Sequence, residues 1–203
     1  MNLANIKIHS VSKATRKVLF FSFVLLMFTA CGAGHYGFSK TYLPNAEEKA
    51  YHEQSKEFGY TDINSNPADY RDKLISWFGI VRKVTLTDDG RYQVQMSHRK
   101  HSDRHLCSSE SNSSCRVTVH FKSSGNFSVL LNLKPSDTQA GLDKVQPGSL
   151  LRVFGKVRCR ENDDEQMECD YDDLGGILLD GEFYRQWPAR YFVTTRAVGS
   201  MRR

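Results

Sequence analysis

The sequence predicts a mainly β domain built around a small five-stranded barrel, preceded by a basic and apolar N-terminal segment and a short helix. Three observations support this prediction. Two long apolar runs, 74–86 and 149–158, are rich in the β-branched and aromatic residues that favour strands. Residues 92–97 alternate between apolar and polar side chains, as in a half-buried strand. Thr87-Asp88-Asp89-Gly90 precedes that segment and is typical of a hairpin turn.

Residues 1–30 combine a basic stretch with a short, largely apolar stretch. The apolar run 18–30 follows four basic residues, Lys7, Lys13, Arg16 and Lys17. No acidic residue interrupts 1–30. The run is shorter than the roughly 20 residues of a membrane-spanning helix. This arrangement is typical of a secretory signal. An ordinary signal peptide or an uncleaved anchor stays open as an alternative to the lipoprotein signal described next.

The end of that segment, Phe28-Thr29-Ala30-Cys31, resembles the lipobox of bacterial lipoproteins, although Phe28 stands where the family usually has leucine. The resemblance implies that residues 1–30 are removed and that Cys31 carries the lipid. Gly32 follows the cysteine, and by analogy with enterobacterial lipoproteins a residue other than aspartate implies the outer membrane. Several acyl chains on one cysteine hold a protein stably. We therefore expect a lipidated tether, 31–44, at the cell outer membrane, with the domain facing the periplasm or the cell surface.

The charge of the chain belongs mostly to the N-terminal segment. The whole chain has a formal net charge of +5, but without residues 1–30 it has 24 basic and 23 acidic side chains. The basic balance is therefore no sign of a nucleic-acid partner.

The four cysteines after Cys31 predict two disulfides. An even number of cysteines in an exported chain fits an oxidising compartment, and four cysteines allow three connectivities. Closeness in sequence favours Cys107–Cys115 and Cys159–Cys169. Long-range pairings and four free thiols are the alternatives.

The remaining elements follow in order. Asn45 and Glu48 form a capping box for a helix that ends at Gly59, within a helix-and-linker segment 45–65. The barrel domain is expected over 66–195, with a basic tail at 196–203. Its first strand, 74–86, contains Gly79, which indicates a bulge or bend. The later expected elements are a polar loop at 98–114, strands at 116–121 and 127–133, a short helix opened by Ser136, a strand at 149–158, an acidic loop at 161–165, a strand at 166–171, and short strands at 177–179 and 191–195.

This order, three strands, a short helix and two strands, is similar to the OB-fold, a five-stranded barrel with its helix between strands three and four. The stretches 67–81 and 146–157 both run apolar residues into a glycine and then a valine, like the openings of such strands. A lipobox joined to this domain resembles the Slp-type outer-membrane lipoproteins, a β-rich family without known catalytic residues.

Three histidines lie in the polar loop: His98, His101 and His105, close to Cys107. Their spacing matches no common zinc signature, their neighbours are basic, and a disulfide would remove the thiolate, so we expect no metal. A solvated, disulfide-closed loop is the simplest interpretation. The same loop is a candidate for an anionic partner such as the sugar phosphates of lipopolysaccharide.

Aromatic and acidic residues suggest further binding candidates. Trp77 and Tyr92, with the three histidines, are candidate ligand-binding residues, although most such aromatic residues fill a small barrel. The acidic cluster at 163–173 lacks calcium-loop spacing. In an OB topology this loop borders the ligand face, where its charge would repel a phosphate backbone.

No catalytic motif is present in the sequence. We therefore expect a non-catalytic envelope lipoprotein with a structural or binding role, no cofactor, and the membrane, an envelope glycan or a protein as partner, but no nucleic acid. An oligosaccharide-binding module acting through the barrel face is the first alternative, and an enzyme without a recognisable motif is the second.

Overall fold

The computed structural model describes residues 37–138, 144–187 and 191–195. The predicted signal segment 1–30, the lipobox with Cys31 and the basic tail 196–203 lie outside the described residues, so those expectations stay predictions.

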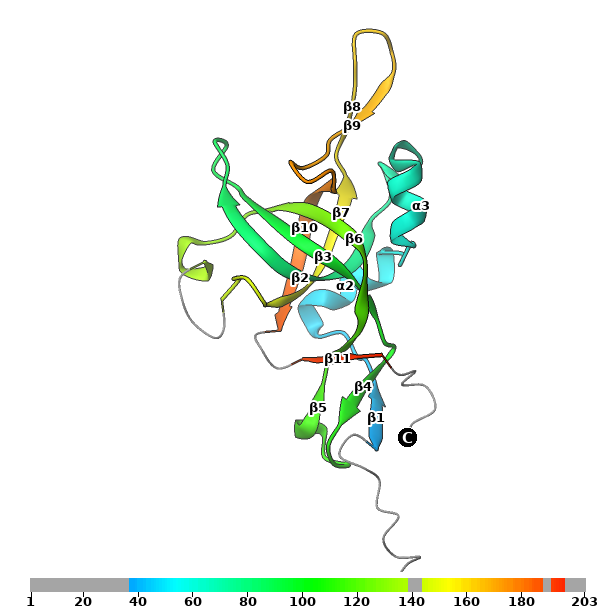
Figure 1. Cartoon of the computed structure of the whole chain (residues 1–203), viewed down its shortest axis with the longest axis vertical. Coiled ribbons are helices and arrows are strands. Elements are labelled where there is room, and N and C mark those ends of the chain that lie inside the picture. Colours follow the sequence, from blue (N-terminus) through cyan, green and yellow to red (C-terminus); the bar gives the residue numbers. More distant parts are fainter. Residues whose placement is uncertain (1–36, 139–143, 188–190, 196–203) are drawn as a thin grey trace, which may run out of the picture.

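Five strands form a closed barrel at the centre of the molecule (Figure 1). They are β2 (Ile75–Leu86), β3 (Tyr92–His101), β6 (Thr118–Leu131), β7 (Leu150–Val157) and β10 (Ile177–Trp187). Neighbours pair antiparallel in the order β10-β7-β2-β3-β6, and parallel pairing of β6 with β10 closes the barrel. The chain is only 16% helical, and these five strands close into one barrel. The predicted mainly β fold with a five-stranded barrel is therefore confirmed.

Smaller elements surround the barrel. A three-stranded sheet, β1 (Phe38–Thr41), β4 (Arg104–Cys107) and β5 (Cys115–Arg116), covers one end, and the hairpin arm β8 (Cys159–Glu161) and β9 (Met167–Cys169) projects from the other (Figure 1). Strand β11 (Phe192–Thr194) pairs with β6. The helical segments are α2 (Ala46–Gln54), α3 (Tyr60–Ser65), and the 3-10 turns η1 (Pro67–Tyr70), η2 (Asn112–Ser114) and η3 (Pro135–Asp137).

The barrel core explains why Gly79 is a glycine. A Cβ atom there would lie 2.9 Å from the Met96 side chain and 3.0 Å from Phe127. Both neighbours are fully buried, so the position has no room for a side chain. The predicted bulge at Gly79 is wrong in position, because the register of β2 against β3 shifts between Val81 and Lys83.

Two strand predictions differ from the structure. The separate strands expected at 116–121 and 127–133 are mainly one strand, β6. The polar residues in its centre led to the prediction of a break between two strands. The fifth barrel strand is β10, whereas 166–171 belongs mostly to the arm. Gly155 permits the approach of β10, since a Cβ there would lie 2.5 Å from the Asp180 carbonyl oxygen. The expected short strand 177–179 is only the beginning of β10.

The N-terminal predictions are partly confirmed. Asn45 and Glu48 form the predicted capping box, but α2 ends before Ser55 rather than at Gly59. The tether expected to reach residue 44 ends earlier, because residues 38–41 form strand β1 against β4. The helix expected at Ser136 begins as the turn η3, and residues 139–143 lie outside the described residues.

Candidate functional site

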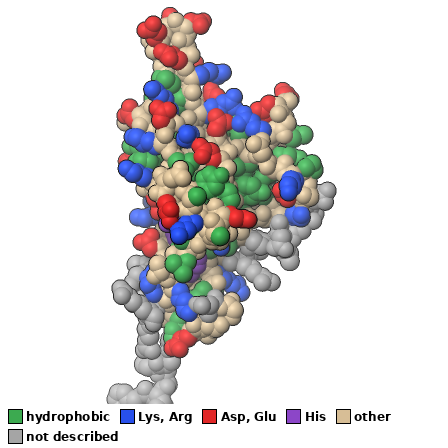
Figure 2. Space-filling model, turned by 180° about the vertical axis from the view of Figure 1, so that it is seen from behind, with side chains coloured by type: hydrophobic (Ala, Val, Ile, Leu, Met, Phe, Trp, Pro, Cys, Tyr) green, Lys and Arg blue, Asp and Glu red, His purple; other side chains and the backbone are tan. Residues whose placement is uncertain are grey.

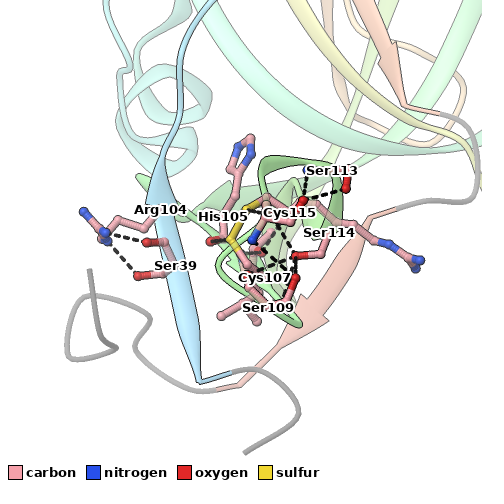
Figure 3. Close-up of a disulfide and its surroundings, with 12 residues drawn as sticks. Ser39, Arg104, His105, Cys107, Ser109, Ser113, Ser114 and Cys115 are labelled. Atoms are coloured by element: carbon pink, nitrogen blue, oxygen red, sulfur yellow. Dashed lines mark hydrogen bonds between the residues drawn. A yellow bond between two sulfur atoms is a disulfide. The ribbon is translucent and has the colours of Figure 1, made fainter. Parts of the chain in front are cut away.

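Both predicted disulfides are confirmed. Cys107–Cys115 joins β4 to β5, and Cys159–Cys169 joins β8 to β9. Figure 3 shows the first of them below the barrel, beside the edge where Arg104 donates hydrogen bonds to the hydroxyl and carbonyl oxygens of Ser39 at 2.8 and 2.7 Å. Strands therefore occupy part of the polar loop expected at 98–114, and only 102–103 and 108–114 lie outside them.

The three histidines are strand residues and not part of a solvated loop. His98 and His101 belong to β3, which continues past the expected end at 97, and His105 belongs to β4. Only 8% of His98 and 9% of His101 is exposed, and His105 is half-buried. The prediction of a solvated loop is wrong because β6 pairs with this end of β3, and the rings of Trp77 and Phe78 pack on His98 and His101 respectively.

A buried charge network lies beside these histidines. Glu48 of α2 is fully buried and lies 2.7 Å from Arg152 of β7 and 2.7 Å from Arg185 of β10. Tyr42 donates a hydrogen bond to the same carboxylate. Burial alone would raise the pKa of Glu48, but the bonds from Tyr42 and Arg185 and the charge of Arg152 outweigh burial and lower it. The carboxylate therefore stays ionised and fixes α2 to the barrel.

His101 and His105 pack against that network. The His101 ring stacks on Phe78 with a centroid distance of 4.2 Å, and Tyr42 lies 5.1 Å from His105. Burial, followed by the nearby positive charges, lowers the pKa of His101 to about 3 and that of His105 to about 4. Both imidazoles are therefore neutral at pH 7, and they do not form a cationic surface for an anionic partner.

Of the other predicted ligand residues, Trp77 lies in the interior and Tyr92 is partly buried. The Trp77 indole nitrogen donates to the Phe58 carbonyl oxygen at 2.8 Å, and its ring contacts His98. Burial, and then the charge of Arg99, lowers the pKa of His98 to about 4. Tyr92 packs against the core cluster. Trp77 and His98 thus lie in one cluster and His101 and His105 in another, so the five candidates do not form one open face.

An open pocket of about 220 Å³ lies elsewhere, on the outer face of β2 and β3. We call it the barrel-face pocket. Its floor consists of two cross-strand pairs, Lys83 with Gln95 and Thr85 with Gln93. The bulge between Val81 and Lys83 creates this floor, because it places one extra residue in β2 and turns Lys83 outwards.

The loop between β9 and β10 forms the opposite wall with Tyr171, Asp172 and Asp173, and Leu178 of β10 completes it. Hydrogen bonds hold this loop on the barrel. The Asp172 carboxylate accepts from the backbone N–H of Gly176 at 2.7 Å and from the Ser128 hydroxyl at 2.6 Å. The Gln95 amide donates to Asp173. These hydrogen bonds therefore fix the wall on the barrel.

The barrel-face pocket is absent from the sequence-based expectations, although two features of the sequence point to it. The alternation over 92–97 places Gln93 and Gln95 on one face, and the acidic cluster follows the fourth strand. The β2 side of the pocket floor could not be predicted because of the bulge, since regular alternation from Val81 would turn Lys83 into the core. Acidic side chains also gather at the tip of the arm (Figure 2).

The barrel-face pocket presents amide, hydroxyl, ammonium and carboxylate groups together with the ring of Tyr171, which is 47% exposed. These groups include both donors and acceptors. A sugar hydroxyl needs such mixed partners, and an aromatic ring provides an apolar surface for the C–H face of a sugar. The volume is below the ~300–1,000 Å³ typical of sites for drug-sized ligands, so the pocket suits one sugar unit.

No model of a known protein family and no curated protein matches this chain. Among the residues that the structure describes, no helix is long and apolar enough to cross a membrane. Within the same ranges, no group of three or more His, Cys, Asp or Glu side chains is arranged to hold a metal ion.

Proposed function

We propose that this protein is a lipid-anchored outer-membrane lipoprotein whose barrel is a non-catalytic binding module for an oligosaccharide. The lipidation part rests on the resemblance of residues 28–31 to a lipobox. The barrel-face pocket is the observation that supports the binding part.

The topology supports the same proposal. The closed five-stranded barrel is consistent with the OB-fold, in which the strand face and the loop between strands four and five bind oligosaccharides or oligonucleotides. In this chain that loop lies between β7 and β10, and it supplies one wall of the barrel-face pocket. Its carboxylates, Asp172 and Asp173, oppose a nucleic-acid backbone and suit sugar hydroxyl groups.

The binding proposal is tested with the full chain, purified in a non-ionic detergent and screened on an array of envelope glycans. We expect binding to a defined set of neutral or mixed glycans, with Tyr171→Ala lowering the signal because it removes the stacking surface. Leu174→Ala is the matched control, since Leu174 is 63% exposed in the same loop and does not line the pocket. Equal losses in both variants, or no binding by the unmodified protein, would refute the proposal.

Lipidation is tested separately with Cys31→Ser. Labelled palmitate should enter the unmodified protein and not this variant, and the variant should leave the membrane fraction. Continued labelling of the variant would exclude Cys31 as the lipidated residue.

A further inference from the structure

A second pocket, of about 350 Å³, lies where the segment after α2 meets the first residues of β2. Three lysines from separate parts of the chain line it, Lys56, Lys73 and Lys156, and we call it the lysine pocket. Its other lining residues are Gln54, Phe58, Asp72 and Leu74. It shares no lining residue with the barrel-face pocket.

The backbone fixes the position of each lysine. Strand β3 pairs with β2 only from Phe78 onwards, and Lys56 occupies the edge that is left beside Ile75. The Lys56 N–H donates to the Leu74 carbonyl oxygen at 3.1 Å, and its own carbonyl oxygen accepts from Ser76 at 3.3 Å. Lys73 is fixed by a backbone bond to Tyr70 at 3.0 Å, and Lys156 lies within β7. The pocket is therefore built by ordered backbone.

The charges around the pocket are mainly positive. Lys156 lies 3.4 Å from Glu182, and Asp72 lies 3.2 Å from Arg71. In the part of the chain that the structure describes, neither Lys56 nor Lys73 has a carboxylate within 4.0 Å. Bringing like charges to one hollow is unfavourable, and a bound anion relieves the repulsion.

Aromatic rings shape one side of the pocket. The Lys73 amine lies 4.5 Å from the centre of the Tyr70 ring and 5.6 Å from that of Phe58. These contacts hold the amine in place while its N–H groups stay free to donate. Phe58 also adds an apolar surface to the pocket lining.

We infer that the lysine pocket binds a phosphate-bearing sugar, with the phosphate at Lys56, Lys73 and Lys156 and the sugar ring beside Phe58. Lysine amines bind phosphate as point charges. The volume falls within the ~300–1,000 Å³ typical of small-ligand sites and leaves room for more than a phosphate. This inference does not depend on the barrel-face pocket, so either proposal can fail alone.

The test measures acetylation of individual lysines by mass spectrometry in the full chain, in a non-ionic detergent. The probes are glucose 6-phosphate, inorganic phosphate and glucose. We expect glucose 6-phosphate to lower labelling of Lys56, Lys73 and Lys156 several-fold and at a lower concentration than inorganic phosphate, while glucose has no effect. Lys122 and Lys134, which are exposed and do not line the pocket, are the controls.

The double variant Lys56→Met/Lys73→Met keeps the apolar stems and removes two charges. We expect it to bind glucose 6-phosphate about a hundredfold more weakly, since each of the two lost charged hydrogen bonds corresponds to about tenfold, with Lys122→Met/Lys134→Met unchanged. Equal protection of all lysines, or equal affinity of both double variants, would overturn the inference. Inorganic phosphate protecting as well as the sugar phosphate would overturn the assignment to a sugar.

A free sugar phosphate and the head group of a phosphorylated glycolipid share this chemistry. Labelling in neutral vesicles with and without such a glycolipid distinguishes the two sources. Protection by the glycolipid at its membrane concentration supports a head group, whereas protection by the soluble sugar phosphate alone supports a free ligand.

Discussion

Glu48→Gln tests the role of the buried charge network in holding α2 on the barrel. The variant keeps the size of the side chain and removes its charge. Arg152 and Arg185 would then face each other without a carboxylate, and the Arg152 side chain is only 6% exposed. Removing one partner of a buried ion pair costs about 3–5 kcal/mol, which is a large part of the ~5–15 kcal/mol stability of a typical domain.

The free energy of unfolding is measured in urea, with the fluorescence of the two tryptophans, Trp77 and Trp187, as one signal and far-UV circular dichroism as the second. The matched control is Glu47→Gln, because Glu47 lies in the same helical turn and is exposed. The control should lose at most ~1 kcal/mol through its interaction with the helix dipole. A loss in Glu48→Gln no larger than in Glu47→Gln would refute the reasoning.

Three further predictions concern the barrel and its arm. Acid should destabilise the protein, because burial lowers the pKa of His98, His101 and His105 to about 4, 3 and 4. The stability that the neutral histidines contribute is fully present above the ordinary histidine pKa of ~6.5. As the pH falls below it, the free energy of unfolding decreases by about 2 kcal/mol for each histidine by pH 5. An unchanged urea midpoint between pH 7 and pH 5 would contradict this. Gly155→Ala should lower the melting temperature by several degrees, since its Cβ would lie 2.5 Å from a backbone oxygen and overpacking costs about 1–3 kcal/mol; a melting temperature equal to that of Lys122→Ala, a change at an exposed position, would be the contrary result. Cys159→Ser/Cys169→Ser should make the projecting arm sensitive to proteases and also lower the melting temperature of the barrel, because the disulfide closes the arm while both cysteines pack against the barrel core; protease resistance and a melting temperature equal to those of the unmodified protein would contradict this.

The sequence allowed prediction of those features that depend on neighbouring residues. The turn at 87–90, the capping box of Asn45 and Glu48 and both disulfides involve groups close together in the chain, so local pattern and spacing were sufficient. The long strands with regular apolar content, β2 and β7, were also predicted nearly to their ends.

The candidate sites depend on long-range pairing, which the local pattern does not contain. His98 and His101 have the polar, basic neighbours of a loop, and they are buried by pairing with β6 and by rings of β2 that pack on them. Glu48 appeared to be no more than a capping residue, because its partners Arg152 and Arg185 lie more than one hundred positions away. The floor of the barrel-face pocket depends on one bulge in β2, which changes the face of Lys83 and Thr85.

The central claim is that the barrel-face pocket binds a sugar. It is tested most directly by calorimetric titration of the full chain with the best glycan from the array. We predict saturable binding that Tyr171→Ala and Gln93→Ala each weaken about tenfold, the effect of ~1.4 kcal/mol, while Leu174→Ala binds like the unmodified protein. Saturable binding with the same affinity in all four proteins would contradict the claim.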